Sequence, residues 1–251
     1  MRRLFLWYLP AGLAFIAALV FAYGLVAFLR GDTGTPVEIP SARIAPQPVR
    51  SGVMPIVLGD SLARGAGDER GLGISGRLDE ELGSRRIPAQ RTVNLGVSGA
   101  RTADLLRRLE APNVRQLIAE ANVVIVSIGG NDLWGGAGFR DGAPPNPEEV
   151  MGGVLEQVGE VVKRVREANP GARIFFVGLY NPFAANPAGT QLTPLVNRWN
   201  ADLLARFGSD PNFVLVQTAD LFTHRDRLSV DRFHPGGEAY GLIARRIADA
   251  L

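Results

Sequence analysis

Short apolar runs alternate with longer amphipathic stretches from about residue 54 to the end of the chain. Apolar runs of this length are too short for helices and are typical of buried strands. They lie at residues 55–58, 92–95, 123–128, 173–179 and 213–217. The stretches with helical periodicity lie at residues 73–82, 102–109, 147–168, 193–207 and 238–250.

The stretch 147–168 has a clear helical pattern. Val154, Val158, Val161 and Val165 recur at intervals of three and four, with charged residues around much of the other face. Such a stretch predicts an amphipathic helix that covers a sheet. The alternation of strands and helices predicts an α/β fold, a three-layer α/β/α sandwich with a mostly parallel five-stranded sheet. Sheets of this kind bind ligands beyond the carboxyl ends of their strands.

An uncharged apolar segment, residues 4–29, precedes this pattern and lies between Arg3 and Arg30. Counted only from residue 11, it would form about 28 Å of helix, against a hydrocarbon core of about 30 Å. We therefore expect residues 1–30 to be a transmembrane anchor, with the N-terminus in the cytoplasm and the rest of the chain outside. The alternatives are a cleaved signal peptide, which would give a secreted form, and a buried core helix.

The region between the apolar segment and the first predicted strand is rich in proline. Pro36, Pro40, Pro46 and Pro48 occur there with little apolar periodicity. This composition predicts a semi-extended linker over residues 31–53. Residues 54–251 are then long enough to form one catalytic domain with a single core.

Composition excludes some classes of function. The formal net charge is only +2, and acidic residues are interspersed with the arginines, so no basic stripe indicates nucleic-acid binding. The chain has no cysteine, which excludes disulfides, thiol nucleophiles and cysteine-bound metal. We expect neither a metal nor a cofactor. The sequence does not indicate an oligomeric state.

Three short motifs contain the side chains that serine-based acyl transfer requires. Ser61 lies in Gly-Asp-Ser-Leu, Asn131 in Gly-Gly-Asn-Asp, and Asp231 and His234 in Asp-Arg-Phe-His-Pro. A serine hydroxyl can act as nucleophile, a histidine paired with a carboxylate as base, and an amide as donor to an oxyanion. Ser61, Gly99 and Asn131 each follow a predicted strand, so we expect them to meet at one edge of the sheet.

Each of these residues also has a structural interpretation. Ser61 could cap a helix or form a turn, and Gly99 and Asn131 could be turn residues. His224 is the rival of His234, but we interpret it as a surface or structural histidine. Asp60 and Asp132 are expected to hold their own loops through hydrogen bonds, Asp132 as a local cap.

Taken together, the motifs resemble the SGNH hydrolases, also called GDSL esterases and lipases. The four residues that name this family correspond to Ser61, Gly99, Asn131 and His234, and the acidic partner three residues before the histidine is Asp231. The resemblance covers residues 54–251. The extended first motif, residues 58–68, resembles a membrane-anchored bacterial branch of lipase/acylhydrolase-like proteins.

The resemblance implies a flavodoxin-like fold and a defined set of roles. Ser61 would be the nucleophile, His234 the base and Asp231 its orienting partner. The oxyanion hole would be formed by the backbone of Ser61 and Gly99 and by the side chain of Asn131. One departure is Ala63, where the branch often has threonine. The motif also differs from the G-x-S-x-G elbow of α/β-hydrolases and from a phosphate-binding loop.

The substrate is less well indicated. Trp134 and Phe139, in the loop after Asn131, are weak candidates for walls of an acyl pocket, and ordinary loop packing is equally consistent with them. We expect a membrane-tethered hydrolase of lipid or small-molecule esters. A thioesterase and an O-acetylesterase of envelope carbohydrates are alternatives with the same triad. A catalytically silent envelope-binding module is an alternative of another class, although its signature would be a broken triad.

Overall fold

The computed structural model describes residues 2–29, 52–133, 147–184, 189–223 and 225–251. The chain divides into two units, Met1–Val49 and Arg50–Leu251. The first contains helix α1 (Arg2–Leu29), with Pro10 inside it. Within the described residues, no helix combines the length and the hydropathy that crossing a membrane requires, so the expected transmembrane helix is not confirmed. The expected linker lies outside the described residues up to residue 51.

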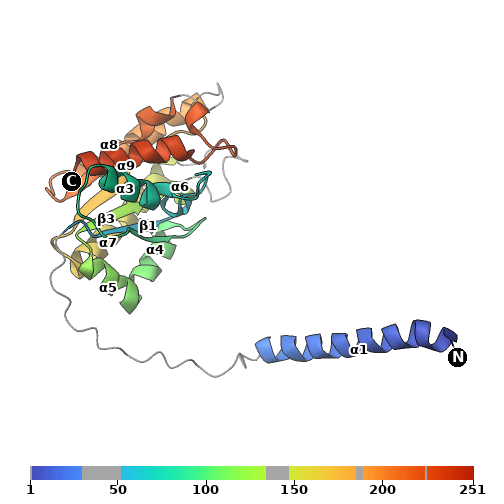
Figure 1. Cartoon of the computed structure of the whole chain (residues 1–251). Coiled ribbons are helices and arrows are strands. Elements are labelled where there is room, and N and C mark those ends of the chain that lie inside the picture. Colours follow the sequence, from blue (N-terminus) through green and yellow to red (C-terminus); the bar gives the residue numbers. More distant parts are fainter. Residues whose placement is uncertain (1, 30–51, 134–146, 185–188, 224) are drawn as a thin grey trace. The chain divides into compact units, whose positions relative to one another are not determined.

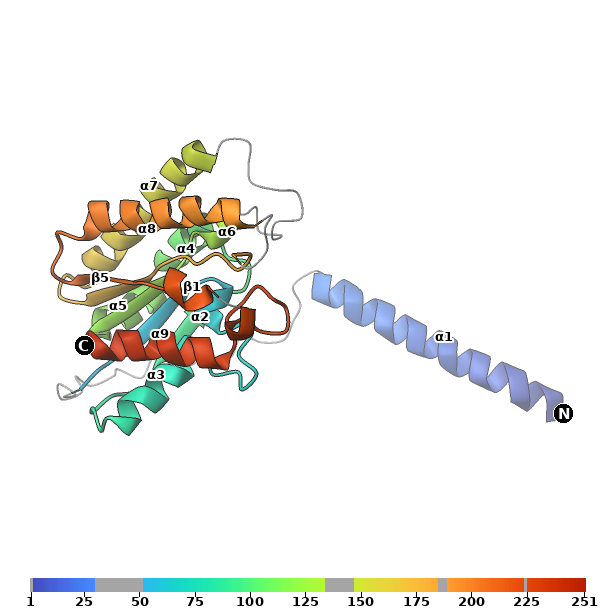
Figure 2. The ribbon, with the colours of Figure 1, turned by 90° about the horizontal axis from the view of Figure 1, so that it is seen from above.

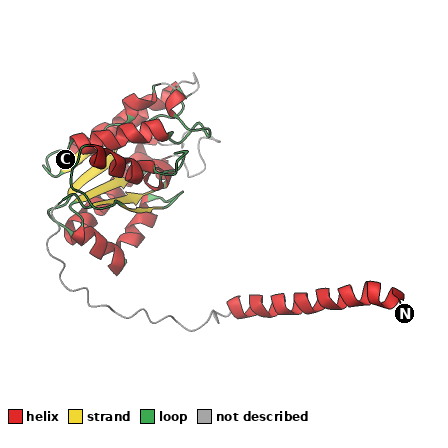
Figure 3. Ribbon diagram, in the orientation of Figure 1, coloured by secondary structure: helices red, strands yellow, loops and turns green. Residues whose placement is uncertain are grey.

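The second unit is built on a parallel sheet of five strands in the order β2-β1-β3-β4-β5 (Figures 1 and 3). This confirms the predicted α/β sheet. Because β1 pairs with β2 on one side and β3 on the other, the strand order reverses at β1, where ligand sites form in such sheets. The strands are β1 (Pro55–Gly59), β2 (Val93–Gly96), β3 (Val123–Ser127), β4 (Arg173–Val177) and β5 (Phe213–Val216).

Helices cover both faces of the sheet (Figure 2). Alternate strand residues point to opposite faces, so Ile56 and Leu58 enter one core cluster while Val57 enters the other. On one face lie α3 (Gly73–Ser84) and α9 (Gly237–Asp249). On the other lie α4 (Thr102–Leu109), α5 (Pro112–Glu120), α7 (Pro147–Ala168) and α8 (Thr193–Phe207).

Several boundaries differ from the sequence expectation. Strand β4 ends at Val177 rather than at Leu179, because the amide and the carbonyl of Leu179 both bond to the side chain of Asn200 in α8. Helix α5 was not predicted, although it starts with Pro112 and buries Val114 and Ile118. The single-turn helices α2 (Ser61–Arg64) and α6 (Gly130–Leu133) were not predicted either, and each lies close behind a strand.

Candidate active site

The turn after β1 fixes the position of Ser61. Gly59 has φ +133°, and a Cβ at this position would overlap the carbonyl oxygen of Ser127 in the neighbouring strand, so only glycine fits. Asp60 then caps α2, accepting a hydrogen bond from the amide of Leu62 at 3.0 Å. Ser61 is therefore the first residue of a helix that begins directly beyond the carboxyl end of β1.

The carboxyl group of Asp60 is buried beside this turn. Burial raises its pKa to about 6, partly opposed by hydrogen bonds from the Ser127 hydroxyl and from backbone amides. The Ser127 Oγ donates to Asp60 Oδ1 at 3.1 Å, and the backbone amide of Asp60 donates to the Ser127 carbonyl at 3.0 Å. Asp60 thus ties the Ser61 turn to β3, as the expected loop-holding role requires.

Ser61, His234 and Asp231 form a continuous chain of hydrogen bonds. The Nε2 atom of His234 lies 2.8 Å from Ser61 Oγ, and its Nδ1 atom lies 2.7 Å from Asp231 Oδ2. Ser61 is far from the other two in sequence, so the fold creates this arrangement. A hydroxyl bonded to an imidazole that is itself held by a carboxylate can be deprotonated as it attacks an electrophile.

The carboxylate of Asp231 is held in its ionised form. Burial would raise its pKa, but hydrogen bonds from the Ser229 hydroxyl, from His234 and from the Phe233 amide outweigh burial and lower it to about 2. The ionised carboxylate therefore stabilises the fold above about pH 4, and this contribution is lost as the pH falls toward 2. Asp231 is charged at any pH near neutrality.

The structure brings Gly99 and Asn131 into the same region. The amide of Val97 donates to the carbonyl of Gly59 at 2.9 Å, which ties the Gly99 loop to the end of β1 beside Ser61. Gly99 has φ +78°, a conformation that favours glycine. Asn131 Nδ2 donates to the carbonyl of Ala100 at 3.0 Å, so the two predicted residues lie on touching segments.

Comparison with known proteins gives the family. Residues 57–242 match the GDSL-like lipase/acylhydrolase family, and the Bacillus subtilis protein YpmR, itself uncharacterized, is 30% identical over 202 residues, covering 77% of this chain and 79% of that protein. The chain belongs to the GDSL-like lipase/acylhydrolase family. It is a carboxylic ester hydrolase of the SGNH type.

Two further proteins resemble this GDSL-like hydrolase. The spore germination lipase LipC of Bacillus licheniformis is 25% identical over 210 residues, covering 77% of this chain and 93% of that protein. The lipase Lip_vut3 from a goat rumen metagenome has the same fold, with a TM-score of 0.68 at 21% identity over 79% of this chain and 97% of that one.

Some sequence expectations about this hydrolase are corrected or lie outside the described residues. Asp132 is not a local cap, because its carboxylate accepts hydrogen bonds from the amide and the hydroxyl of Thr102, at the start of α4, at 2.9 and 3.0 Å. Trp134, Phe139 and His224 lie outside the described residues. Within the part of the chain that the structure describes, no group of three histidine, cysteine, aspartate or glutamate side chains is placed to hold a metal ion.

Sequence reasoning missed the residues of the GDSL-like hydrolase that support His234. Tyr180 Oη donates to the carbonyl of Phe233 at 2.7 Å. Gly67 has φ +93°, and a Cβ there would lie 2.6 Å from the Pro235 oxygen and 2.8 Å from the His234 Cβ. The signal that could have identified Gly67 is its place in the first motif, six residues after Ser61.

Proposed function

We propose that this hydrolase cleaves carboxylic esters through a catalytic triad of Ser61, His234 and Asp231. The observation that carries the proposal is the hydrogen-bonded chain from Ser61 Oγ through both imidazole nitrogens to Asp231, with separations of 2.8 and 2.7 Å. Both separations are within the range of good hydrogen bonds. The geometry is therefore ready for proton transfer without rearrangement of the three side chains.

In the proposed mechanism, Ser61 Oγ attacks the carbonyl carbon of the ester while His234 Nε2 accepts the hydroxyl proton. The tetrahedral intermediate collapses, the bond to the alcohol oxygen breaks, and the imidazolium gives that oxygen its proton. An acyl group then remains on Ser61. A water molecule, deprotonated by His234, attacks the carbonyl carbon of this acyl-enzyme. The bond to Ser61 Oγ then breaks, the imidazolium returns its proton to that oxygen, and the carboxylic acid is released. Asp231 stays ionised throughout and holds the imidazole in the required tautomer.

The proposed oxyanion hole has three donors, the backbone amides of Ser61 and Gly99 and the side-chain amide of Asn131. The side-chain amide nitrogen of asparagine carries two N–H bonds. On Asn131, the bond to the Ala100 carbonyl uses one of them and orients the group. The second is the one we assign to the oxyanion. Gly99 has a positive φ, a backbone conformation that residues with a side chain rarely adopt.

Replacing Asn131 with alanine should lower kcat by about 100- to 1,000-fold, because one oxyanion donor is lost in a preorganised site. Steady-state kinetics on an activated ester measure this effect. Asn122→Ala is the matched control, since the Asn122 amide also donates to a backbone carbonyl, that of Gly52. The control should keep its kcat. Equal kcat values in the two variants would remove Asn131 from the oxyanion hole.

A fluorophosphonate probe tests the triad on the full chain. The probe should form one covalent adduct, and peptide mass spectrometry should place it on Ser61, because only a serine activated by a base reacts rapidly. A folded protein without an adduct, or with the adduct on another serine, would contradict the proposed nucleophile.

For the substrate, we propose lipid or other carboxylic esters, with thioesters and acetylated sugars as the competing classes. The similarity to the lipase LipC supports placing lipid and other carboxylic esters ahead of thioesters and acetylated sugars. A panel of p-nitrophenyl esters of rising acyl length, compared with acyl thioesters and acetylated sugars, measures the preference. A kcat/KM that is highest on thioesters or on acetylated sugars would replace the proposed substrate class.

We also propose that the N-terminal segment tethers the catalytic domain to the outer face of a membrane. The support is the sequence, which has no charge between Arg3 and Arg30, together with exposed apolar side chains of α1 such as Phe15 and Phe21. The full chain should then stay with the membrane fraction after washing with alkaline carbonate. Val20→Arg should weaken this retention. Release of the unaltered chain by carbonate would count against the tether.

A further inference from the structure

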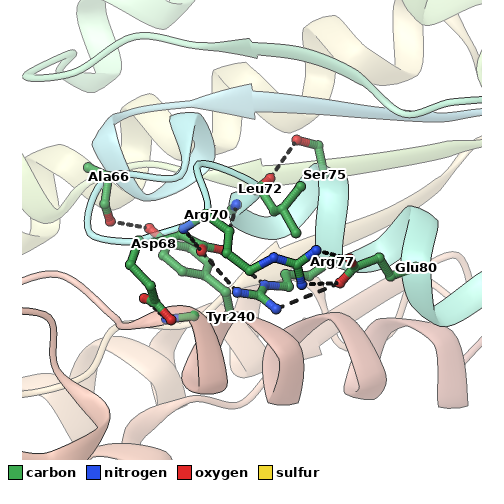
Figure 4. Close-up of polar contacts among 11 residues, drawn as sticks. Ala66, Asp68, Arg70, Leu72, Ser75, Arg77, Glu80 and Tyr240 are labelled. Carbon is green, nitrogen blue, oxygen red and sulfur yellow. Dashed lines mark hydrogen bonds and ion pairs between the residues drawn. The ribbon is translucent and has the colours of Figure 1, made fainter.

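The loop between α2 and α3, residues 65–71, is fixed by a buried carboxylate. Asp68 Oδ2 accepts hydrogen bonds from the Gly73 amide at 3.0 Å and from Arg77 Nε at 2.9 Å. Asp68 Oδ1 accepts from the Arg70 amide and from Arg77 Nη2, both at 2.9 Å. The Asp68 side chain is fully buried, and the Arg77 side chain is 14% exposed. The two side chains point toward each other (Figure 4). The loop is therefore rigidly attached to α3.

This loop contacts α9 through two hydrogen bonds. Glu69 Oε2 accepts a hydrogen bond from the backbone amide of Gly237, the first residue of α9, at 2.9 Å. One turn further along the helix, Tyr240 Oη donates to the carbonyl of Ala66 at 2.7 Å (Figure 4). The loop that follows Ser61 is thus joined to the helix that follows His234.

Close packing accompanies these bonds. A Cβ at Gly237 would overlap Arg77 Nη2 and would lie 2.6 Å from Glu69 Oε1, so the polar cluster rests directly on the backbone of this residue. Gly67 packs in the same way against His234 and Pro235. A shift of residues 65–71 would therefore displace the start of α9 and the histidine before it.

The opposite side of the His234 loop is held by bonds within its own backbone and by the bond from Tyr180 Oη to the Phe233 carbonyl. The amide of Ser229 donates to the carbonyl of His234 at 2.8 Å, and the amide of Gly236 donates to the carbonyl of Arg227 at 2.9 Å. These bonds define the shape of the loop but do not connect it to Ser61. Besides the bond between Ser61 and His234 themselves, three contacts make that connection. Gly67 packs against His234, Glu69 bonds to Gly237, and Tyr240 bonds to Ala66.

We propose that Glu69 is a positioning residue that sets the separation between His234 and Ser61 through its hydrogen bond to Gly237. The inference rests on the proposed triad. An anionic side chain at the start of a helix is favourable for two reasons. It accepts a hydrogen bond from a backbone amide that has no partner within the helix, and it interacts with the positive end of the helix dipole. Gly237 lies three residues after His234, so this bond restrains the backbone that carries the imidazole.

The test measures the rate constant for fluorophosphonate labelling of Ser61 in the full chain, because this rate reports the activation of the serine without knowledge of the natural ester. Glu69→Ala should lower that rate constant, and kcat on a p-nitrophenyl ester, by about 10- to 100-fold, since a displacement of about 1 Å can cost 100-fold. KM should change little. Glu69→Gln should recover most of the rate, because an amide oxygen can accept the same hydrogen bond.

Glu80→Ala is the matched control. Glu80 is also an exposed carboxylate in this cluster, and it contacts Arg70 and Arg77. Its side chain contacts neither α9 nor the His234 loop through any hydrogen bond among the described residues. The control should label at the wild-type rate. Equal rates for Glu69→Ala and Glu80→Ala would overturn the proposal, as would a Glu69→Gln variant as slow as Glu69→Ala. Failure of the wild-type chain to label would instead overturn the triad.

Discussion

Replacing Ser61 with alanine is expected to reduce ester hydrolysis by about a million-fold, the loss that removal of a nucleophilic serine causes in hydrolases of this chemistry. The Ser61 Oγ atom bonds to His234 Nε2 at 2.8 Å, and alanine has no oxygen at this position to attack the ester. Covalent labelling by a fluorophosphonate should disappear together with hydrolysis. Both losses follow from the removal of one oxygen atom.

The same substitution should leave the fold intact. The cap of α2 is the carboxylate of Asp60, and the bonds from Gly65 and Ala66 go to the backbone carbonyl of Ser61, so alanine keeps all of them. Ser84→Ala is the matched control, because the Ser84 hydroxyl bonds to the carbonyl of Glu81 on the surface of α3 and lies outside the proposed site. Both variants should unfold at nearly the wild-type temperature, and only Ser61→Ala should be inactive. Residual labelling of Ser61→Ala at a comparable rate would identify a different nucleophile.

Hydrophobic periodicity predicted the parts of the fold in which local pattern and tertiary packing agree. The bounds of α4, α7 and α8 match the expected ranges, because their apolar residues recur with a helical period and face the sheet. Helix α5 was missed because it is short and follows α4 after a gap of two residues. Its Pro112, at the start of the helix, was a local signal that could have been used.

The candidate site was predicted for a similar reason. Parallel strands place their carboxyl ends at one edge, so the motifs after β1, β2 and β3 had to meet there. The partners of Glu69 and Asp132 could not be predicted in this way. Glu69 bonds to a residue 168 positions away, and Asp132 to one 30 positions away. Neither carboxylate belongs to a periodic pattern, so only the three-dimensional arrangement identifies its role.

Replacing Asp231 with asparagine is expected to lower kcat by about 10,000-fold, the size of the effect that this change has in serine proteases. The hydrogen bonds around Asp231 explain why the substitution should be so harmful here. Its Oδ1 atom accepts from the backbone amides of Phe233 and His234 at 2.8 and 2.9 Å, and those donors require an oxygen at that position. The nitrogen of the new amide must then occupy the other position, which faces His234 Nδ1.

An N–H at that position donates to His234 Nδ1 and therefore favours the tautomer whose proton is on Nε2. This tautomer cannot accept the proton of Ser61, so the base is lost while the geometry stays nearly unchanged. Asp226→Asn, the same chemical change at an exposed residue of the same region, should keep full activity. The pKa of Asp231 is about 2, so the wild-type carboxylate is ionised at every pH used for the assay. The asparagine amide does not ionise, so raising the pH should not give the variant the missing negative charge. A loss of less than tenfold in Asp231→Asn would show that His234 keeps its reactive tautomer without this carboxylate.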